Sequence, residues 1–183
     1  LKEASVTATE NALLLAASAP GLTSVDNAAC EPRVTDLAEV LVKMGADIEG
    51  LGSNCLHIRG TKNLAGFRHR IMNDHIEAGT LAIAAGCTQG DVIIKGADKK
   101  NLIMTSRILE QMGLQFSYPD ESTLHVKPSK LRSGVKKIQV GLWPGFPTDL
   151  MSILLVTATQ SEGICLIHEK MFESRLFFVD KLI

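Results

Sequence analysis

The chain has 183 residues, of which 45% are hydrophobic and 21% charged, which is typical of a globular protein with one large core or two small ones. Its 19 basic and 20 acidic residues give a formal net charge of −1, so we expect neither nucleic acid nor a membrane surface as a partner. No apolar run reaches the roughly 20 residues of a membrane-spanning helix.

The first predicted helix runs from Thr9 to Ala19, with Thr9 as its N-cap. Pro20-Gly21 stops this helix, and a short strand is predicted at residues 23–25. A second helix begins near Pro32, where the missing N–H is harmless, and ends at Gly45. Its apolar face consists of Val34, Leu37, Leu41 and Met44.

The same frame recurs at an offset of 68, from residue 34 to residue 102. The second copy of the helix face is Leu102, Thr105, Leu109 and Met112, and Gly113 ends it. The strand at residues 56–58 has its copy at 124–126. A helix at 79–85, stopped by Gln89-Gly90, and a strand at 91–94 precede the second copy. We interpret this as an internal repeat.

A third copy begins at Thr148-Asp149, continues through a helix at 150–158 and reaches a strand at 164–167. The unit is therefore roughly 70 residues of α/β structure, and neighbouring units are expected to bury one another. The third copy stops at Ile183 where its second helix would begin, and the chain starts at Leu1 without a leader, so we expect a piece of a longer protein. The polar stretch at 62–70 is the predicted boundary between units.

The four cysteines lie far apart and form no CxxC pair: Cys30, Cys55, Cys87 and Cys165. Zinc sites usually need close pairs and secreted disulfide scaffolds are denser in cysteine, so we predict reduced thiols, a cytoplasmic location and no metal. Phosphate-loop, dinucleotide, GxSxG and HExxH motifs do not occur in the sequence, which argues against the commonest nucleotide-binding, hydrolase and metalloprotease designs.

Three polar segments lie at the same place in the repeat, at the start of its first helix: residues 5–9, 73–80 and 145–149. Helix N-termini attract phosphate and carboxylate groups. The alternative is that Thr9, Thr80 and Asp149 are simply helix caps.

Asp149 stands out because two prolines and a glycine stiffen the segment before it, and a rigidly held carboxylate can act as a general base. Glu173 and Arg175 would share one face of a strand, where the arginine can clamp a carboxylate or phosphate. A plain surface ion pair fits their spacing equally well.

Several segments together resemble the UDP-N-acetylglucosamine 1-carboxyvinyltransferase family of the EPSP synthase superfamily. They are Ser5–Asn11, Asn27–Pro32, Asp74–Thr80, Pro144–Asp149 and Phe172–Arg175. The resemblance implies a partial inside-out α/β barrel (an inverse α/β prism) built from βα repeats. Residues 1–70 would be the last repeat of one lobe, and residues 71–183 two repeats of the other, the last one truncated.

The resemblance also implies transfer of the enolpyruvyl group of phosphoenolpyruvate to the 3-hydroxyl of UDP-N-acetylglucosamine, with release of phosphate and without a cofactor. This is the first committed step of peptidoglycan synthesis. By position, Ser5, Val6 and Thr7 would contact the diphosphate, and Asp149 would be the base with Thr148 beside it. The remaining implied substrate contacts are Met171 near the nucleotide and Asp74, Glu173 and Arg175 in the cleft.

The sequence departs from the family pattern at three positions, where Thr7 replaces a glycine and His75 and Cys30 replace arginines. The family's reactive cysteine lies upstream of Leu1, so the remainder of the polypeptide is an expected partner and the 183 residues alone are expected to be inactive. Thr7 and His75 favour one alternative, a non-catalytic homologue that binds UDP-sugar and regulates or scaffolds. Transfer to a shikimate phosphate is a third reading, against which the Phe-Pro-Thr-Asp element argues.

Overall fold

The structure is a computed structural model that describes residues 1–182. The chain forms two compact units, one ending at Met72 and the other beginning at Asn73. Residues 62–70 contain neither helix nor strand, but they belong to the first unit because they are bonded to it. Ala65 N donates to Met44 O at 2.8 Å, and the ring of His69 lies 2.9 Å from Asp36 on α2 (Pro32–Lys43). Within the described residues, no helix is long and apolar enough to cross a membrane.

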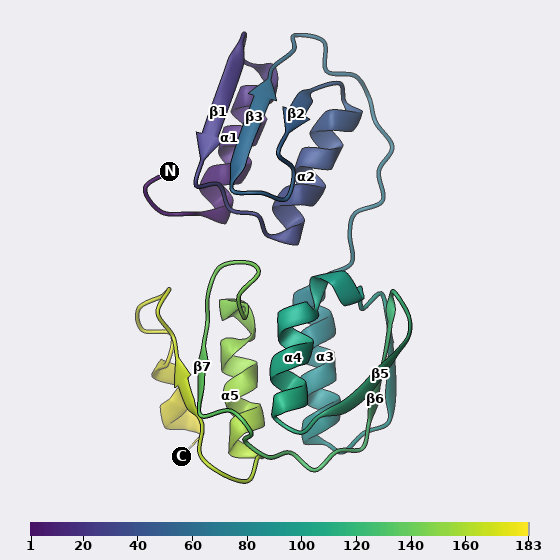
Figure 1. Ribbon diagram of the computed structural model, residues 1–183, viewed down its shortest axis with the longest axis vertical. Helices are drawn as coiled ribbons and strands as arrows, with labels where there is room; N and C mark the ends of the chain where they lie inside the picture. Colours follow the sequence, from purple (N-terminus) through teal and green to yellow (C-terminus); the bar gives the residue numbers. More distant parts are fainter. Residues whose placement is uncertain (183) are drawn as a thin grey trace. The chain divides into compact units, whose positions relative to one another are not determined.

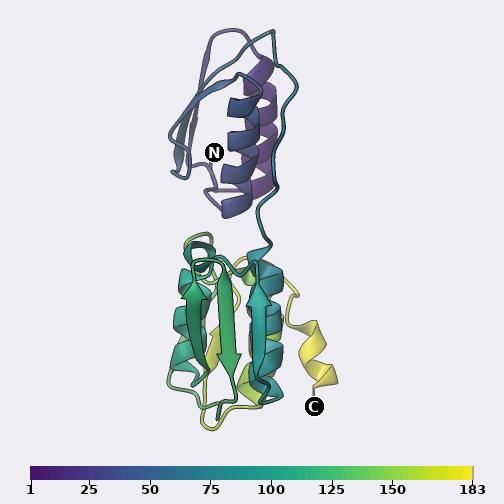
Figure 2. The same ribbon diagram turned by 90° about the vertical axis from the view of Figure 1, so that its right-hand side faces the viewer.

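The first unit packs two helices on one face of a three-stranded antiparallel sheet with the order β1-β3-β2 (Figures 1 and 2). Its elements are α1 (Val6–Ser18), β1 (Leu22–Asp26), α2, β2 (Asp47–Glu49) and β3 (Cys55–Arg59). The strands alternate between buried and exposed positions, so that Leu56 and Ile58 of β3 face the helices while His57 faces solvent. Leu13 and Ala17 of α1 are fully buried in this core.

The second unit repeats this plan and then extends it. Its antiparallel sheet has the order β4-β6-β5, and a parallel pair, β7-β8, follows. The repeated elements are α3 (His75–Cys87), β4 (Val92–Lys95), η1 (Lys99–Asn101), α4 (Ile103–Gln111), β5 (Gln115–Asp120) and β6 (Thr123–Lys127). The later ones are β7 (Lys137–Gln139), η2 (Thr148–Leu150), α5 (Met151–Thr159), β8 (Leu166–His168) and η3 (Phe177–Lys181).

The internal repeat is visible in the hydrogen bonds that end α2 and α4. At the end of α2, Gly45 has φ +107° and Ala46 N donates to Leu41 O at 3.0 Å. At the end of α4, Gly113 has φ +87° and Leu114 N donates to Leu109 O at 3.0 Å. Both ends are Schellman motifs, in which the left-handed residue favours glycine. The predicted helix faces and their glycine ends are confirmed.

The starts of the first helix in the first two copies were predicted wrongly. α1 begins at Val6 rather than Thr9, and α3 begins at His75 rather than Gly79. The N-caps are Ser5 and Asp74, because their side chains accept hydrogen bonds from the first-turn N–H groups.

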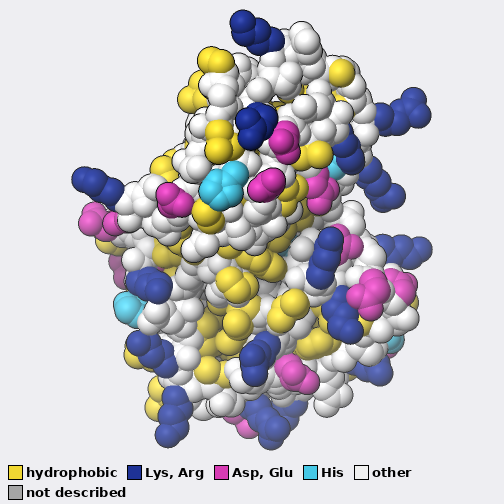
Figure 3. Space-filling view, turned by 45° about the horizontal axis from the view of Figure 1, so that its top comes forward, with side chains coloured by type: hydrophobic (Ala, Val, Ile, Leu, Met, Phe, Trp, Pro, Cys, Tyr) yellow, Lys and Arg dark blue, Asp and Glu magenta, His cyan; other side chains and the backbone are white. Residues whose placement is uncertain are grey.

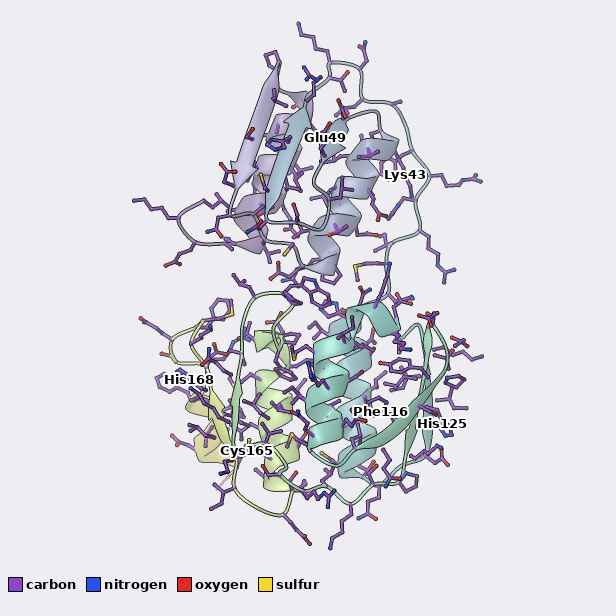
Figure 4. The ribbon with its side chains drawn as sticks, viewed as in Figure 1. Lys43, Glu49, Phe116, His125, Cys165 and His168 are labelled. Atoms are coloured by element: carbon purple, nitrogen blue, oxygen red, sulfur yellow. The ribbon has the colours of Figure 1, made fainter. Side chains whose placement is uncertain are left out.

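The third copy differs from the first two in its pairing. β7 and β8 are parallel, with Ile138 opposite Ile167, and α5 forms the crossover between them. β8 spans residues 166–168 rather than the predicted 164–167; Cys165 lies just before it and His168 ends it (Figure 4). β8 leads directly into the segment that starts at Glu169.

Candidate functional site

Asp149 lies in η2, behind a tight turn. Gly145 N donates to Leu142 O at 2.6 Å, and a Cβ on Gly145 would lie 2.7 Å from that oxygen, so the close approach requires glycine. Phe146 and Leu150 are 2% and 0% exposed and bury the turn on both sides of Asp149. The carboxylate of Asp149 is therefore presented at the surface by a turn that is anchored in the core.

Arg175 is the partner of Asp149. Its Nη1 and Nη2 each lie 3.2 Å from Asp149 Oδ1, and Nη1 also donates to the carbonyl oxygen of Thr148 at 2.7 Å and to its Oγ1 at 3.1 Å. The side chains of Arg175 and Asp149 are 32% and 42% exposed, so the Asp149 carboxylate remains accessible to a ligand hydroxyl. The pair by itself adds little stability, but the several acceptors on one turn define the position of the guanidinium.

Glu169 connects this pair to the segment after β8. Its Oε2 accepts from Thr148 Oγ1 at 2.6 Å, and its Oε1 accepts from the N–H groups of Met171 at 2.6 Å and Phe172 at 3.3 Å. Burial alone raises the pKa of Glu169. The hydrogen bonds from Thr148, Met171 and Phe172 and the charge of Arg175 outweigh burial and hold the pKa below its usual range.

The segment after Glu169 is a turn and not the strand that the spacing of Glu173 and Arg175 suggested. Ser174 has φ +62°, which reverses the chain and separates the directions of its two neighbours. Arg175 lies over the Phe172 ring, with 4.6 Å from Cζ to the ring centroid, and pairs with Asp149. Glu173 is exposed. The alternative prediction of an ion pair between Glu173 and Arg175 is therefore wrong, because Arg175 pairs with Asp149.

Met171 contacts both the Asp149 cluster, through its backbone, and the core of the second unit, through its side chain. It is half-buried and packs against the hydrophobic cluster of the second unit. Its N–H is one of the donors to Glu169, so its backbone belongs to the hydrogen-bonded site while its side chain belongs to the core edge.

The predicted diphosphate contacts lie at the N-terminus of α1 in the first unit. Ser5 caps the helix, with Oγ accepting from Ala8 N at 3.3 Å, and Val6 and Thr7 form the first turn. Thr7 is exposed. Thr9 is not a cap: it is fully buried, donating to Ser5 O at 2.7 Å and accepting from Ala29 N at 2.9 Å.

Asp74 caps α3, and its Oδ1 accepts from the N–H groups of Ile76 and Glu77 at 2.8 and 3.2 Å. Asp74 is exposed, so its carboxylate can cap the helix and still contact a ligand. His75 is 8% exposed, and its ring meets Trp143 edge-on at 5.9 Å between centroids. His75 thus packs the start of α3 against the residue that precedes Pro144.

The alternative in which Thr80 and Asp149 are helix caps is wrong as well. Thr80 lies inside α3 and donates to Ile76 O at 2.8 Å. Asp149 lies in the first turn of η2, after its N-cap Pro147. Capping falls to Ser5 and Asp74 because the helices begin earlier than the apolar pattern indicated.

The cysteines do not join the Asp149 cluster. None of the four forms a disulfide within the described residues, and all four are partly exposed. Burial, followed by the charge of Glu31, raises the pKa of the Cys30 thiol, and a hydrogen bond to Asp26, partial desolvation and the charge of Asp26 raise that of Cys55. A raised pKa lowers the thiolate fraction, which makes these two thiols poor nucleophiles.

The structure therefore brings Thr148, Asp149, Met171 and Arg175 together and leaves Glu173 exposed on the adjoining turn. Sequence reasoning missed Glu169, whose three hydrogen bonds connect the cluster. The only signal in the sequence was its place at the start of the segment that ends with Arg175. Acidic and basic side chains are interspersed over the face drawn in Figure 3, in keeping with the near-zero net charge.

The arrangement of repeated α/β units is shared with a solved enolpyruvyl transferase. The structure matches that of the enolpyruvyl transferase NikO from Streptomyces tendae with a TM-score of 0.85 and 26% identity, over 96% of this chain and 42% of that chain. Residues 1–183 match the family model of EPSP synthase (3-phosphoshikimate 1-carboxyvinyltransferase), and the chain belongs to this family. The expected fold, a partial inside-out α/β barrel, is confirmed.

Two curated relatives with higher sequence identity share one name. The UDP-N-acetylglucosamine 1-carboxyvinyltransferase of Borreliella burgdorferi is 49% identical over 190 residues, and that of Treponema denticola is 46% identical over 190 residues. Each alignment covers 100% of this chain and 44% of the relative, so the chain spans less than half the length of these proteins.

Proposed function

We propose that the full-length protein containing this chain transfers the enolpyruvyl group of phosphoenolpyruvate to the 3-hydroxyl of UDP-N-acetylglucosamine and releases phosphate. The observation that carries the proposal is the accessible Asp149 carboxylate, held by Arg175 on an anchored turn. A carboxylate held in this way can take the proton of a sugar hydroxyl as that oxygen adds to C2 of phosphoenolpyruvate and a proton adds to the methylene carbon; loss of one methyl proton, with phosphate as the leaving group, then gives the enolpyruvyl ether. The names of the relatives at 49% and 46% identity support this choice of substrates.

The other predicted residues take supporting roles in this proposal. Ser5, Val6 and Thr7 contact the diphosphate at the N-terminus of α1, where the first N–H groups of a helix favour anions. Asp74, Thr148, Met171, Glu173 and Arg175 contact the sugar nucleotide or line the cleft. The groups that complete the phosphoenolpyruvate site come from the remainder of the polypeptide. Residues 1–70 then belong to one lobe and residues 71–183 to the other.

The biological role follows from the proposed reaction. Its product commits sugar nucleotide to peptidoglycan, so we place the protein in the cytoplasm, where its substrates occur, and upstream of cell shape and division. No cofactor takes part in this proposal, because the transfer involves no net oxidation or reduction and phosphate is its leaving group.

The test is phosphate release from phosphoenolpyruvate by the full-length protein, with and without UDP-N-acetylglucosamine. Asp149→Asn keeps the shape of the side chain but removes the base, so sugar-dependent release should fall to background. The matched control is Asp120→Asn on the exposed end of β5, which should behave as wild type. Sugar-nucleotide binding without any phosphate release by the wild-type protein would favour the non-catalytic alternative instead.

A further inference from the structure

All three hydrogen bonds that the Glu169 carboxylate accepts come from this chain. Its carboxylate accepts from Thr148 Oγ1 and from the N–H groups of Met171 and Phe172. It is half-buried, so a neutral or misplaced group here would leave these donors without an ionised acceptor. Its contacts join two segments that are 21 residues apart in the sequence.

These contacts also set the direction of a hydrogen-bond chain. A threonine hydroxyl has one hydrogen, and a carboxylate has none to give. Because the hydrogen of Thr148 points to Glu169, the lone pairs of Thr148 Oγ1 are left to accept, and Nη1 of Arg175 lies 3.1 Å from that oxygen. The same Nη1 reaches the Thr148 carbonyl oxygen and Asp149 Oδ1.

We infer that Glu169 is a positioning residue for the transfer reaction. It orients the Thr148 hydroxyl so that Thr148 holds Arg175, and Arg175 in turn holds the Asp149 carboxylate in the direction of the substrate hydroxyl. Glu169 acts through these side chains and touches no substrate itself. This inference rests on the proposed function.

Glu169→Gln is the direct test in the full-length protein. The glutamine amide donates toward Thr148 where the carboxylate accepted, which reverses the hydroxyl and turns its hydrogen toward Arg175. We expect kcat for phosphate release to fall about tenfold to a hundredfold, as for a misplaced catalytic group, with KM for the sugar nucleotide within about threefold of wild type. Glu121→Gln, on the exposed turn between β5 and β6, is the control and should leave both constants unchanged.

Two Thr148 variants separate orientation from stability. Thr148→Val removes the hydroxyl and should match the kcat loss of Glu169→Gln, whereas Thr148→Ser keeps the hydroxyl and should restore most of the activity. In a Thr148→Val background, Glu169→Gln should cost little more, because the two residues act on one contact. Thermal unfolding of each variant identifies any loss that is due to unfolding rather than to orientation.

The inference is overturned if Glu169→Gln keeps wild-type kcat while Asp149→Asn is inactive, or if the losses in the double variant multiply. A wild-type protein that releases no phosphate contradicts the proposed function instead. In that case, ¹H–¹⁵N spectra of the Arg175 guanidinium test the Glu169–Thr148–Arg175 contacts without any need for activity. Slowed rotation in wild type that is lost in Glu169→Gln supports the inference, and identical spectra overturn it.

Discussion

Arg175 places both terminal guanidinium nitrogens 3.2 Å from Oδ1 of Asp149, which lies 26 residues earlier in the sequence. The two residues belong to different segments, η2 and the turn that follows β8. Both segments are connected by Glu169, so the geometry of the pair depends on contacts beyond the pair itself.

We predict that Arg175→Lys lowers sugar-dependent phosphate release by about tenfold to a hundredfold. Lysine keeps the charge. Its single ammonium group lacks the planar fork with which the arginine contacts both Asp149 and the Thr148 carbonyl oxygen. Steady-state kinetics of the full-length variant measure this. Arg107→Lys, on the exposed side of α4, is the control, and an Arg175→Lys protein as active as this control would disprove the role of the fork.

The lowered pKa of Glu169 predicts a loss of stability in acid. Because the folded pKa lies below the unfolded one, the stabilisation is complete above the unfolded value, about 4.3, and is lost as the pH falls through the folded value. Urea unfolding between pH 7 and pH 3 should show a steeper loss in wild type than in Glu169→Gln. Parallel curves for the two proteins would contradict this assignment.

Cys55 is predicted to alkylate slowly because its thiol pKa is raised, first by the hydrogen bond to Asp26 Oδ1 at 3.4 Å. Asp26→Asn removes the negative acceptor, so the pKa should fall and the rate of iodoacetamide modification at pH 8 should rise. Peptide mass spectrometry reports the rate at each cysteine. Cys165, in the other unit, is the internal control, and a Cys55 rate that does not change on substitution of Asp26 would refute the assignment.

Gly60→Ala should destabilise the first unit by about 1–3 kcal/mol. A Cβ at this position would lie 2.0 Å from Ala19 O and 2.4 Å from Ala16 O, and backbone at the end of α1 cannot move aside cheaply. Gly66→Ala is the matched control, since nothing lies within 4 Å of its Cβ position. Urea unfolding of both variants measures the difference; equal midpoints would show that the end of α1 yields easily.

The Asp149 turn was partly predictable. Pro147 and Gly145 indicated a stiff approach, and the Phe-Pro-Thr-Asp element carried the family resemblance. The partner of Asp149 was not predictable, because spacing suggested Glu173 for Arg175 and only the positive φ of Ser174 turns the two apart. Glu169 was missed because one of its donors, Thr148, lies 21 residues away in the sequence, and the N–H groups of Met171 and Phe172 reach its carboxylate only because the segment forms a turn.

By itself, the sequence determined the repeat, the helix faces and the glycine ends at Gly45 and Gly113, because periodicity and a left-handed backbone position are local properties. The structure corrected where the helices begin, at the local caps Ser5 and Asp74, which the apolar pattern did not single out. The tertiary structure decided what no local pattern could. It decided the cluster around Asp149, because hydrogen bonds between segments more than 20 residues apart form only when packing has brought those segments together.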